Sequence, residues 1–282
     1  MLEEKLVNYT QQIPDDYQPI FIGGAGRSGT TLLRVMLNSH PNLCSGPEFK
    51  LLPQFMDLYK QVNSSSYQPI AESYLLSSEY IQSIFATFIY NFLEPIRNYS
   101  RAQRVVEKSP HNVLVMKELV QVFPNAKFIH VIRDGRDVAC SLKRMEWTNF
   151  NGEPLWYVEN LENATKYWAE IITKGIEDAK SPLLNGKIKF VKYEELVSNP
   201  KNIMKKVLNF LEEQWNPSVL DYNKVQRNEE PVESSTKQVS KKLYTQSMNR
   251  WQREFTDENK EMFKNIAGSL LIQMGYEDSL NW

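Results

Sequence analysis

A glycine-rich turn with one arginine and two threonines is the part of this chain best suited to chemistry. It reads Gly24-Ala25-Gly26-Arg27-Ser28-Gly29-Thr30-Thr31 and directly follows the apolar run at 19–23. Glycines let a backbone turn with its N–H groups facing inward, and the N-terminus of a following helix adds positive potential at the same point. Thr30 takes the position where the P-loop of a nucleotide hydrolase has its lysine. The turn therefore predicts a site for a small anion, held by Arg27 and backbone N–H groups without a metal ion.

A second cationic turn follows the continuous apolar run at 127–132, which is typical of a strand inside a parallel sheet. That run ends at Arg133, where a P-loop hydrolase places its metal-holding aspartate. Ser141 comes eight residues later, one to two turns into the next helical stretch. Arg133 and Ser141 can therefore converge on an anion at the carboxyl edge of the sheet. The alternative is a solvated, salt-bridged turn, which the presence of the first loop disfavours.

Strands and helices that alternate along the chain must position these two turns. The runs that predict strands are 20–23, 104–107, 127–132 and 187–193. Helical apolar faces follow them, a long helix is predicted at 160–180, and two helices close the chain. This alternation is typical of a parallel sheet with right-handed crossovers. Since no repeat or Gly/Ser linker divides the chain, we predict one α/β domain over 1–282, with a central parallel sheet flanked by helices.

Two long segments lack this regular pattern. Residues 45–103 are polar and aromatic and are interrupted by Pro47, Pro53, Pro69 and Pro95, so they predict helices and loops that form a lid or an acceptor wall. Residues 225–247 are polar and predict a loop.

Composition limits the function further. The chain has 282 residues and a formal net charge of −1, so no global basic field indicates nucleic acid as a partner. Cys44 and Cys140 are too few for a disulfide framework and lack metal-ligand spacing, which favours a reducing compartment. Residues 1–19 lack the features of a signal peptide, and no apolar run is long enough for a transmembrane segment. A cytoplasmic location is therefore expected.

Together, the two motifs resemble the sulfotransferases that use 3′-phosphoadenosine 5′-phosphosulfate (PAPS). The 5′-phosphosulfate loop of that family corresponds to residues 24–32, and its 3′-phosphate motif corresponds to 128–136, closed by Ser141. Other segments are similar to the tyrosylprotein sulfotransferase branch and its bacterial relatives: His40-Pro41-Asn42, Lys108, 123–128, 193–196, Arg250-Trp251 and Gly275-Tyr276. The resemblance runs from about residue 20 to 276 and leaves out 50–100.

This resemblance implies a P-loop NTPase-like sulfotransferase fold and a division of labour along the chain. Residues 20–44 would supply the 5′-phosphosulfate loop and helix, 127–145 the 3′-phosphate motif, and 45–103 the acceptor side. Gly26, Arg27, Ser28, Gly29, Thr30 and Thr31 would hold the 5′-phosphosulfate. Lys108 would offset charge on the bridging oxygen as it leaves, Arg133 and Ser141 would hold the 3′-phosphate, and Tyr193 and Arg250 would lie near the nucleotide. PAPS would be the donor substrate, 3′-phosphoadenosine 5′-phosphate (PAP) the product, and no metal would be needed.

A hydroxyl acceptor also needs a general base, and two residues qualify by resemblance. Glu48 lies twenty-one residues after Arg27, the spacing of the catalytic glutamate in the tyrosylprotein branch. His111 lies three residues after Lys108, as in the cytosolic small-molecule sulfotransferases. Glu48 is the favoured base and His111 its rival.

The acceptor stays open: a small molecule, lipid, sugar or peptide with a hydroxyl group would serve, and a homodimer is possible. Two other functions compete with sulfuryl transfer. A P-loop kinase or NTPase is disfavoured by the missing lysine and the missing strand-end aspartate. A non-catalytic PAP- or PAPS-binding protein is disfavoured because Lys108 and Glu48 are both present.

Overall fold

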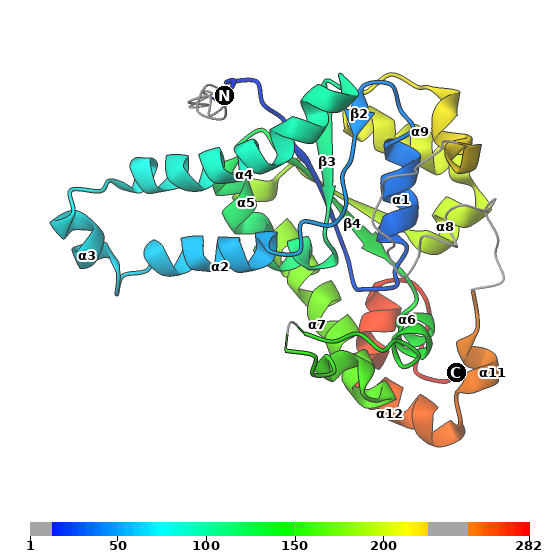
Figure 1. Cartoon of the computed structure of the whole chain (residues 1–282). Coiled ribbons are helices and arrows are strands. Elements are labelled where there is room, and N and C mark those ends of the chain that lie inside the picture. Colours follow the sequence, from blue (N-terminus) through cyan, green and yellow to red (C-terminus); the bar gives the residue numbers. More distant parts are fainter. Residues whose placement is uncertain (1–12, 150, 225–247) are drawn as a thin grey trace.

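Five parallel strands form the centre of the protein, in the spatial order β2–β3–β1–β4–β5 (Figure 1). The computed structural model describes residues 13–149, 151–224 and 248–282. Its strands are β1 Ile20–Gly23, β2 Leu43–Cys44, β3 Arg104–Lys108, β4 Lys127–Ile132 and β5 Ile188–Lys192. The prediction of a single α/β domain around a parallel sheet is confirmed. The two-residue strand β2 is too short to leave a hydrophobic pattern, and the sequence did not indicate it.

The register of the sheet brings the carboxyl ends of its three inner strands together. Ile22 of β1 lies beside Lys108 of β3 on one side and beside Ile129 of β4 on the other. The glycine loop after β1, Lys108 at the end of β3 and Arg133 after β4 therefore meet at one edge of the sheet. This edge is where open α/β sheets bind their ligands.

Helices cover both faces of the sheet because its inner strands are apolar on both sides. Ile20 and Ile22 pack with α1, α8 and α9, whereas Phe21 between them packs on the opposite side with α4, α5 and α7. The helices are α1 Thr30–Leu37, α2 Leu52–Val62, α3 Gln68–Ser73, α4 Ser78–Ser100, α5 Met116–Val122, α6 Gly135–Leu142, α7 Leu161–Ala179, α8 Tyr193–Ser198, α9 Pro200–Phe210, α11 Trp251–Glu254 and α12 Asp257–Gln273. The 3-10 turns are η2 Pro110–Val115, η3 Trp156–Val158, η4 Pro182–Leu184, η5 Pro217–Leu220 and η6 Tyr222–Lys224.

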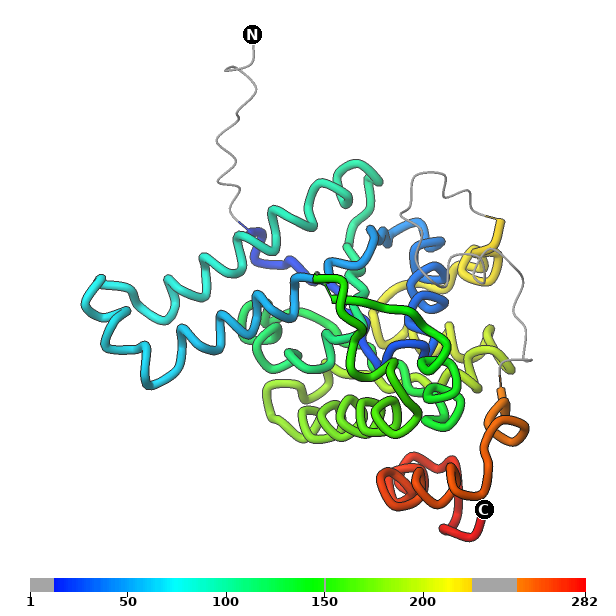
Figure 2. Tube along the Cα trace, turned by 60° about the horizontal axis from the view of Figure 1, so that its bottom comes forward, coloured from blue at the N-terminus to red at the C-terminus, as the bar shows by residue number. Residues whose placement is uncertain are grey.

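Helices α2, α3 and α4 follow β2 and precede β3 in the chain. They form an arm that projects away from the sheet (Figures 1 and 2). Helices and loops were predicted for this region, but the predicted break at Pro95 is wrong, because α4 continues through it. Contacts of α4 with β3 and α5 offset the hydrogen bond that proline removes. Pro53 and Pro69 lie in the first turns of α2 and α3, where a missing N–H is tolerated.

Smaller differences concern where elements begin and end. Tyr193 begins α8 instead of ending the preceding strand, and the helix predicted after Lys108 starts as the 3-10 turn η2. Cys44 and Cys140 are both buried and free. Within the described ranges, no helix is long and apolar enough to cross a membrane. The predicted loop at 225–247 and most of the N-terminal segment 1–19 lie outside the described residues.

Candidate active site

The glycine loop forms the tight cradle that its sequence predicts. Gly29 is the N-cap of α1 and has a φ of +93°, so the helix begins at Thr30 and its first N–H groups point into the loop. A Cβ at Gly29 would lie 2.4 Å from Cδ2 of Tyr193, so only glycine lets that ring approach. Arg27 also has a positive φ, +71°. Two of the predicted nucleotide-binding residues, Gly29 and Tyr193, are thus in direct contact.

Three predicted residues meet where β3 ends beside this loop. The Lys108 side chain is fully buried, and its Nζ donates a hydrogen bond of 3.1 Å to Oγ1 of Thr31. The same ammonium group forms an ion pair with the carboxylate of Glu48. The proposed base and the proposed leaving-group lysine therefore contact each other at the first turn of α1.

The loop that carries Glu48 is tied to α1 by two hydrogen bonds. The backbone N–H of Ser45 donates to Oδ1 of Asn38 at 2.7 Å. The guanidinium of Arg34 donates to the carbonyl of Gly46 at 3.2 Å. Because α1 begins at the glycine loop, the position of Glu48 is fixed to the same helix that frames the anion site.

The buried carboxylate of Glu107 binds the backbone of the same loop at Phe49, the residue after Glu48. It lies in β3 directly before Lys108 and is 3% exposed. Its Oε1 accepts hydrogen bonds from the Phe49 backbone N–H at 3.0 Å and from Oγ of Ser109 at 2.8 Å. Burial raises the pKa of Glu107 to about 7. Glu107 was not among the predicted site residues, although a carboxylate inside a short apolar strand was the signal available.

His111 lies near Glu48 but is engaged in a hydrogen bond. Oη of Tyr167 accepts the backbone N–H of Gly26 at 3.1 Å and lies 3.0 Å from Nε2 of His111. The Tyr167 hydroxyl and Nε2 of His111 therefore share a hydrogen bond whose direction depends on the tautomer of the imidazole. Burial lowers the pKa of His111, which favours the neutral ring. His111 thus helps to hold the glycine loop through Tyr167, a residue that only the tertiary structure reveals.

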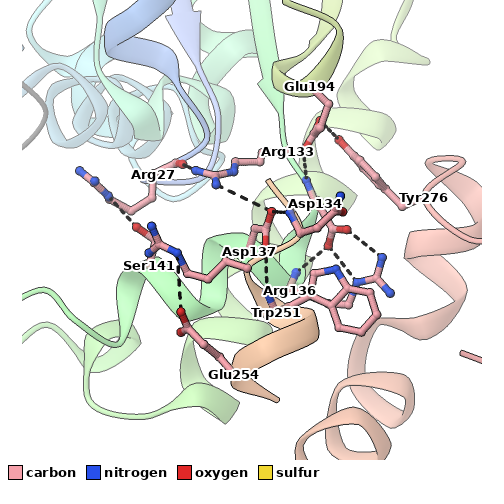
Figure 3. A network of polar contacts seen from close by, with 12 residues as sticks. Arg27, Arg133, Asp134, Arg136, Asp137, Ser141, Glu194, Trp251, Glu254 and Tyr276 are labelled. Atoms are coloured by element: carbon pink, nitrogen blue, oxygen red, sulfur yellow. Dashed lines mark hydrogen bonds and ion pairs between the residues drawn. The ribbon is translucent and has the colours of Figure 1, made fainter. Parts of the chain in front are cut away.

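The second predicted motif meets the first through Arg27. Nε of Arg27 donates to Oγ of Ser141 at 3.0 Å, and the guanidinium of Arg133 donates to the Arg27 carbonyl at 3.0 Å (Figure 3). The same guanidinium lies 4.6 Å from the centroid of the Tyr193 ring. The structure therefore brings Arg27, Arg133, Ser141 and Tyr193 together as one group.

Asp137 connects this group to the C-terminal part of the chain. Its carboxylate lies 3.8 Å from the Arg133 guanidinium and accepts the backbone N–H groups of Asn249 at 2.8 Å and Trp251 at 3.1 Å. These two residues flank Arg250, whose Nε lies 3.6 Å from Glu254. Figure 3 shows Asp137 between Arg133 and Trp251. The backbone of its two neighbours thus places Arg250 beside the site. The sequence did not predict this role of Asp137.

Two more distant segments meet the turn after Arg133. Glu194 at the start of α8 accepts the backbone N–H of Asp134 at 3.0 Å, and the Tyr276 hydroxyl donates to the same carboxylate at 3.0 Å (Figure 3). The Arg136 guanidinium packs against both the Trp251 and the Trp282 ring, 3.8 and 4.4 Å from their centroids. Segments around residues 194, 251 and 276 therefore stabilise the turn that presents Arg133.

The residues present fit a ligand with two anionic ends. Lys108 and the start of α1 lie at one end, and Arg133 with Ser141 lies at the other. Oγ of Ser28 is buried and has no hydrogen-bond partner among the described residues, so a bound anion could accept its proton. The described ranges contain no cluster of three or more His, Cys, Asp or Glu side chains suited to a metal ion. That the reaction needs no metal stays a prediction.

Comparison with known proteins agrees with this geometry. The model of the sulfotransferase family matches residues 19–217. The protein-tyrosine sulfotransferase of Drosophila melanogaster is 28% identical over 287 residues, which cover 99% of this chain and 54% of the fly protein. Protein-tyrosine sulfotransferase 1 of Homo sapiens is 28% identical over 280 residues, which cover 97% of this chain and 74% of the human protein. The chain spans about half the length of the fly relative.

A solved structure shares the fold. The sulfotransferase domain from the Synechococcus PCC 7002 olefin synthase superposes with a TM-score of 0.62 at 22% identity, over 91% of this chain and 98% of that domain. The predicted sulfotransferase fold is thereby confirmed. Since the family match also spans the glycine loop, Glu48, Lys108 and the Arg133 motif, the chain belongs to the sulfotransferase family.

Proposed function

We propose that the protein transfers the sulfuryl group of PAPS to a hydroxyl group of an acceptor. The observation that carries the proposal is the contact of Glu48, Lys108 and Thr31 at the start of α1. A carboxylate that can take a proton, a cation and a helix N-terminus meet there, beside a second cationic group at Arg133. Family membership supports the same activity.

The donor would be held at its two ends by this chain's own residues. Gly26 and residues 27–31, with the N-terminus of α1, would bind the 5′-phosphosulfate through N–H groups, hydroxyls and Arg27. Arg133 and Ser141 would bind the 3′-phosphate, with Tyr193 and Arg250 beside the nucleotide. PAPS supplies an activated sulfuryl group. The protein has mainly to align the reactants and stabilise the charge that develops.

We infer different roles for Glu48 and Lys108: Glu48 would act on the attacking hydroxyl group and Lys108 on the leaving oxygen. The bond between sulfur and the bridging oxygen breaks while a bond between sulfur and the acceptor oxygen forms. Glu48 takes the proton of the acceptor hydroxyl, and Lys108 stabilises negative charge on the bridging oxygen. His111 is less suited to take that proton, because its Nε2 is already engaged in a hydrogen bond with the Tyr167 hydroxyl.

For the acceptor, the curated relatives suggest where to begin. They are named protein-tyrosine sulfotransferases, so a tyrosine hydroxyl in a peptide is the first acceptor to test. The α2–α4 arm follows directly on the Glu48 loop, which supports a role for residues 45–103 on the acceptor side (Figure 1).

Transfer of labelled sulfate from PAPS tests the proposal. The acceptors would be tyrosine peptides, simple phenols, sugars and long-chain alcohols, each with the wild-type protein and the Lys108→Ala variant. We expect labelled product with at least one acceptor class and a strong loss in the variant. Transfer of phosphate from ATP with Mg²⁺, in place of sulfate transfer, would overturn the proposal in favour of a kinase. Tight PAP binding without transfer to any acceptor would favour a non-catalytic binding protein.

A further inference from the structure

The buried carboxylate of Glu107 accepts hydrogen bonds from two segments beside the site. Besides Phe49 and Ser109, its carboxylate accepts a hydrogen bond from Nδ2 of Asn112, at 2.5 Å on Oε2. The three donors stand in two different segments, the Glu48 loop and the turn after β3. A single buried carboxylate therefore joins both to the strand that ends in Lys108.

Asn112 extends this connection to the central strand. Its Nδ2 also donates to the carbonyl of Ile22 at 3.1 Å. Since both neighbours of Nδ2 are acceptors, the orientation of the Asn112 amide is fixed. Ile22 lies directly before Gly23 and the glycine loop, so Asn112 links Glu107 to the strand from which that loop begins.

The chemistry of these contacts requires an acceptor oxygen at both ends of the side chain at 107, because the Phe49 N–H and the Asn112 NH₂ can only donate. Burying a carboxyl group is unfavourable unless such hydrogen bonds compensate. A glutamine has one acceptor oxygen and one donor NH₂, so it can keep the bond from Phe49 or the bond from Asn112 but not both. Leucine has a similar size and no acceptor, so it removes both bonds.

We propose that Glu107 is a positioning residue that holds the Glu48 loop against β3, so that the Glu48 carboxylate stays beside Lys108. The proposal rests on the proposed function for its catalytic consequence. Its structural part concerns the Phe49 backbone N–H and can be measured without activity. Glu107 touches no reacting atom and acts through the backbone of Phe49.

The test compares Glu107→Leu with Asp178→Asn. Asp178 is 1% exposed in α7 and forms ion pairs with Lys117 and Lys174, so it controls for the loss of a buried carboxylate elsewhere. Glu107→Leu leaves the Phe49 N–H without this acceptor and should speed its hydrogen exchange by about tenfold. It should lower kcat by between about 10- and 100-fold through misplacement of Glu48, with PAP affinity changed less than about twofold. Asp178→Asn should change neither the exchange nor kcat.

Unchanged exchange at Phe49 in Glu107→Leu would overturn the proposal, as would a loss of PAP affinity equal to the loss of kcat. If Glu107→Leu does not fold, Ser109→Ala removes one donor and should give a smaller change in the same two quantities. No effect of Ser109→Ala on either quantity would then overturn it. If the wild-type protein transfers no sulfate, the proposed function fails, while the exchange of Phe49 still tests the position of the loop.

Discussion

Glu48 and His111 differ in what their side chains already do, and this difference makes their roles separable. Glu48 forms an ion pair with Lys108, whereas Nε2 of His111 is engaged in a hydrogen bond with the Tyr167 hydroxyl. Glu48→Gln keeps the shape and removes the basicity, so kcat should fall by on the order of 10²-fold or more with nearly unchanged PAP affinity. His111→Asn should cost less. Steady-state kinetics with PAP titrations would decide, and the reverse ranking would give the proton-abstracting role to His111.

A second residue-scale prediction concerns the protonation of Glu107. Its pKa of about 7 lies above the value of about 4.3 that an unfolded chain gives a glutamate, because burial disfavours the charged form. Lys108, the adjacent cation on β3, opposes part of this rise in pKa. Between these two values the folded state binds more protons than the unfolded state. The contribution of Glu107 to the free energy of unfolding therefore falls as the pH rises through this window.

Melting temperatures of the wild type and Glu107→Gln from about pH 4.5 to pH 8 would check this sign. The wild type should lose stability relative to the variant as the pH rises, and the difference should level off above pH 8. A difference that is constant across the range would show that Glu107 keeps one charge state throughout.

At this scale the sequence identified residues whose signal is local. Arg27, Lys108, Arg133 and Ser141 stand at strand ends or one to two helical turns beyond, so their neighbours in the chain indicate their place at the sheet edge. Glu107 gains its role from Phe49, which lies 58 positions away in the chain. Tyr167 gains its role from Gly26, which lies 141 positions away. No pattern along the chain specifies such a pair, and only the folded structure reveals it.

Among the elements, the turn between β4 and α6 contacts both the glycine loop and the start of α8. Arg133 donates to the Arg27 carbonyl and lies over Tyr193, so it supports the glycine loop as well as the predicted 3′-phosphate site. Arg133→Ala should therefore weaken PAP binding by about 2 kcal/mol or more, since a charged hydrogen-bond partner is lost. Isothermal titration with PAP would measure it.

Arg144→Ala is the matched control for that variant. Arg144 is 56% exposed and pairs with Glu254 near the same helix. Its removal should change PAP affinity by less than about 0.5 kcal/mol, as is usual for an exposed ion pair. Equal losses in the two variants would show that Arg133 acts only through its general positive charge.

The elements themselves followed from hydrophobic periodicity wherever an apolar face was clear. The strands at 20–23 and 127–132 match β1 and β4 at both ends. The arm was the exception, because α4 carries apolar residues on both its buried and its exposed side. Ile81 and Phe85 are buried, whereas Phe88 and Phe92 are about half exposed. A helix that is apolar on two sides has weak periodicity, and its Pro95 then suggested a break that the packing does not allow.

For the molecule as a whole, the distribution of charge predicts a reaction without a metal ion. Thr30 replaces the P-loop lysine and Arg133 stands where an aspartate would hold Mg²⁺. A divalent cation at this edge would meet guanidinium groups with few oxygen ligands to offset the repulsion. Sulfate transfer should therefore persist in excess EDTA, while Lys108→Ala should lower kcat far more than chelation does. Loss of activity in EDTA with recovery on added Mg²⁺ would contradict this prediction and revive the kinase alternative.

The two buried thiols have a practical consequence for such measurements. Cys44 and Cys140 are the only cysteines of the chain, and burial raises their pKa to about 11 and about 12, so neither reacts readily with maleimide at neutral pH. A single cysteine introduced at Leu75, which is 93% exposed on the arm, would then take a fluorophore selectively. Fluorescence anisotropy of that dye could follow an acceptor as it approaches the arm, without a label on the acceptor itself.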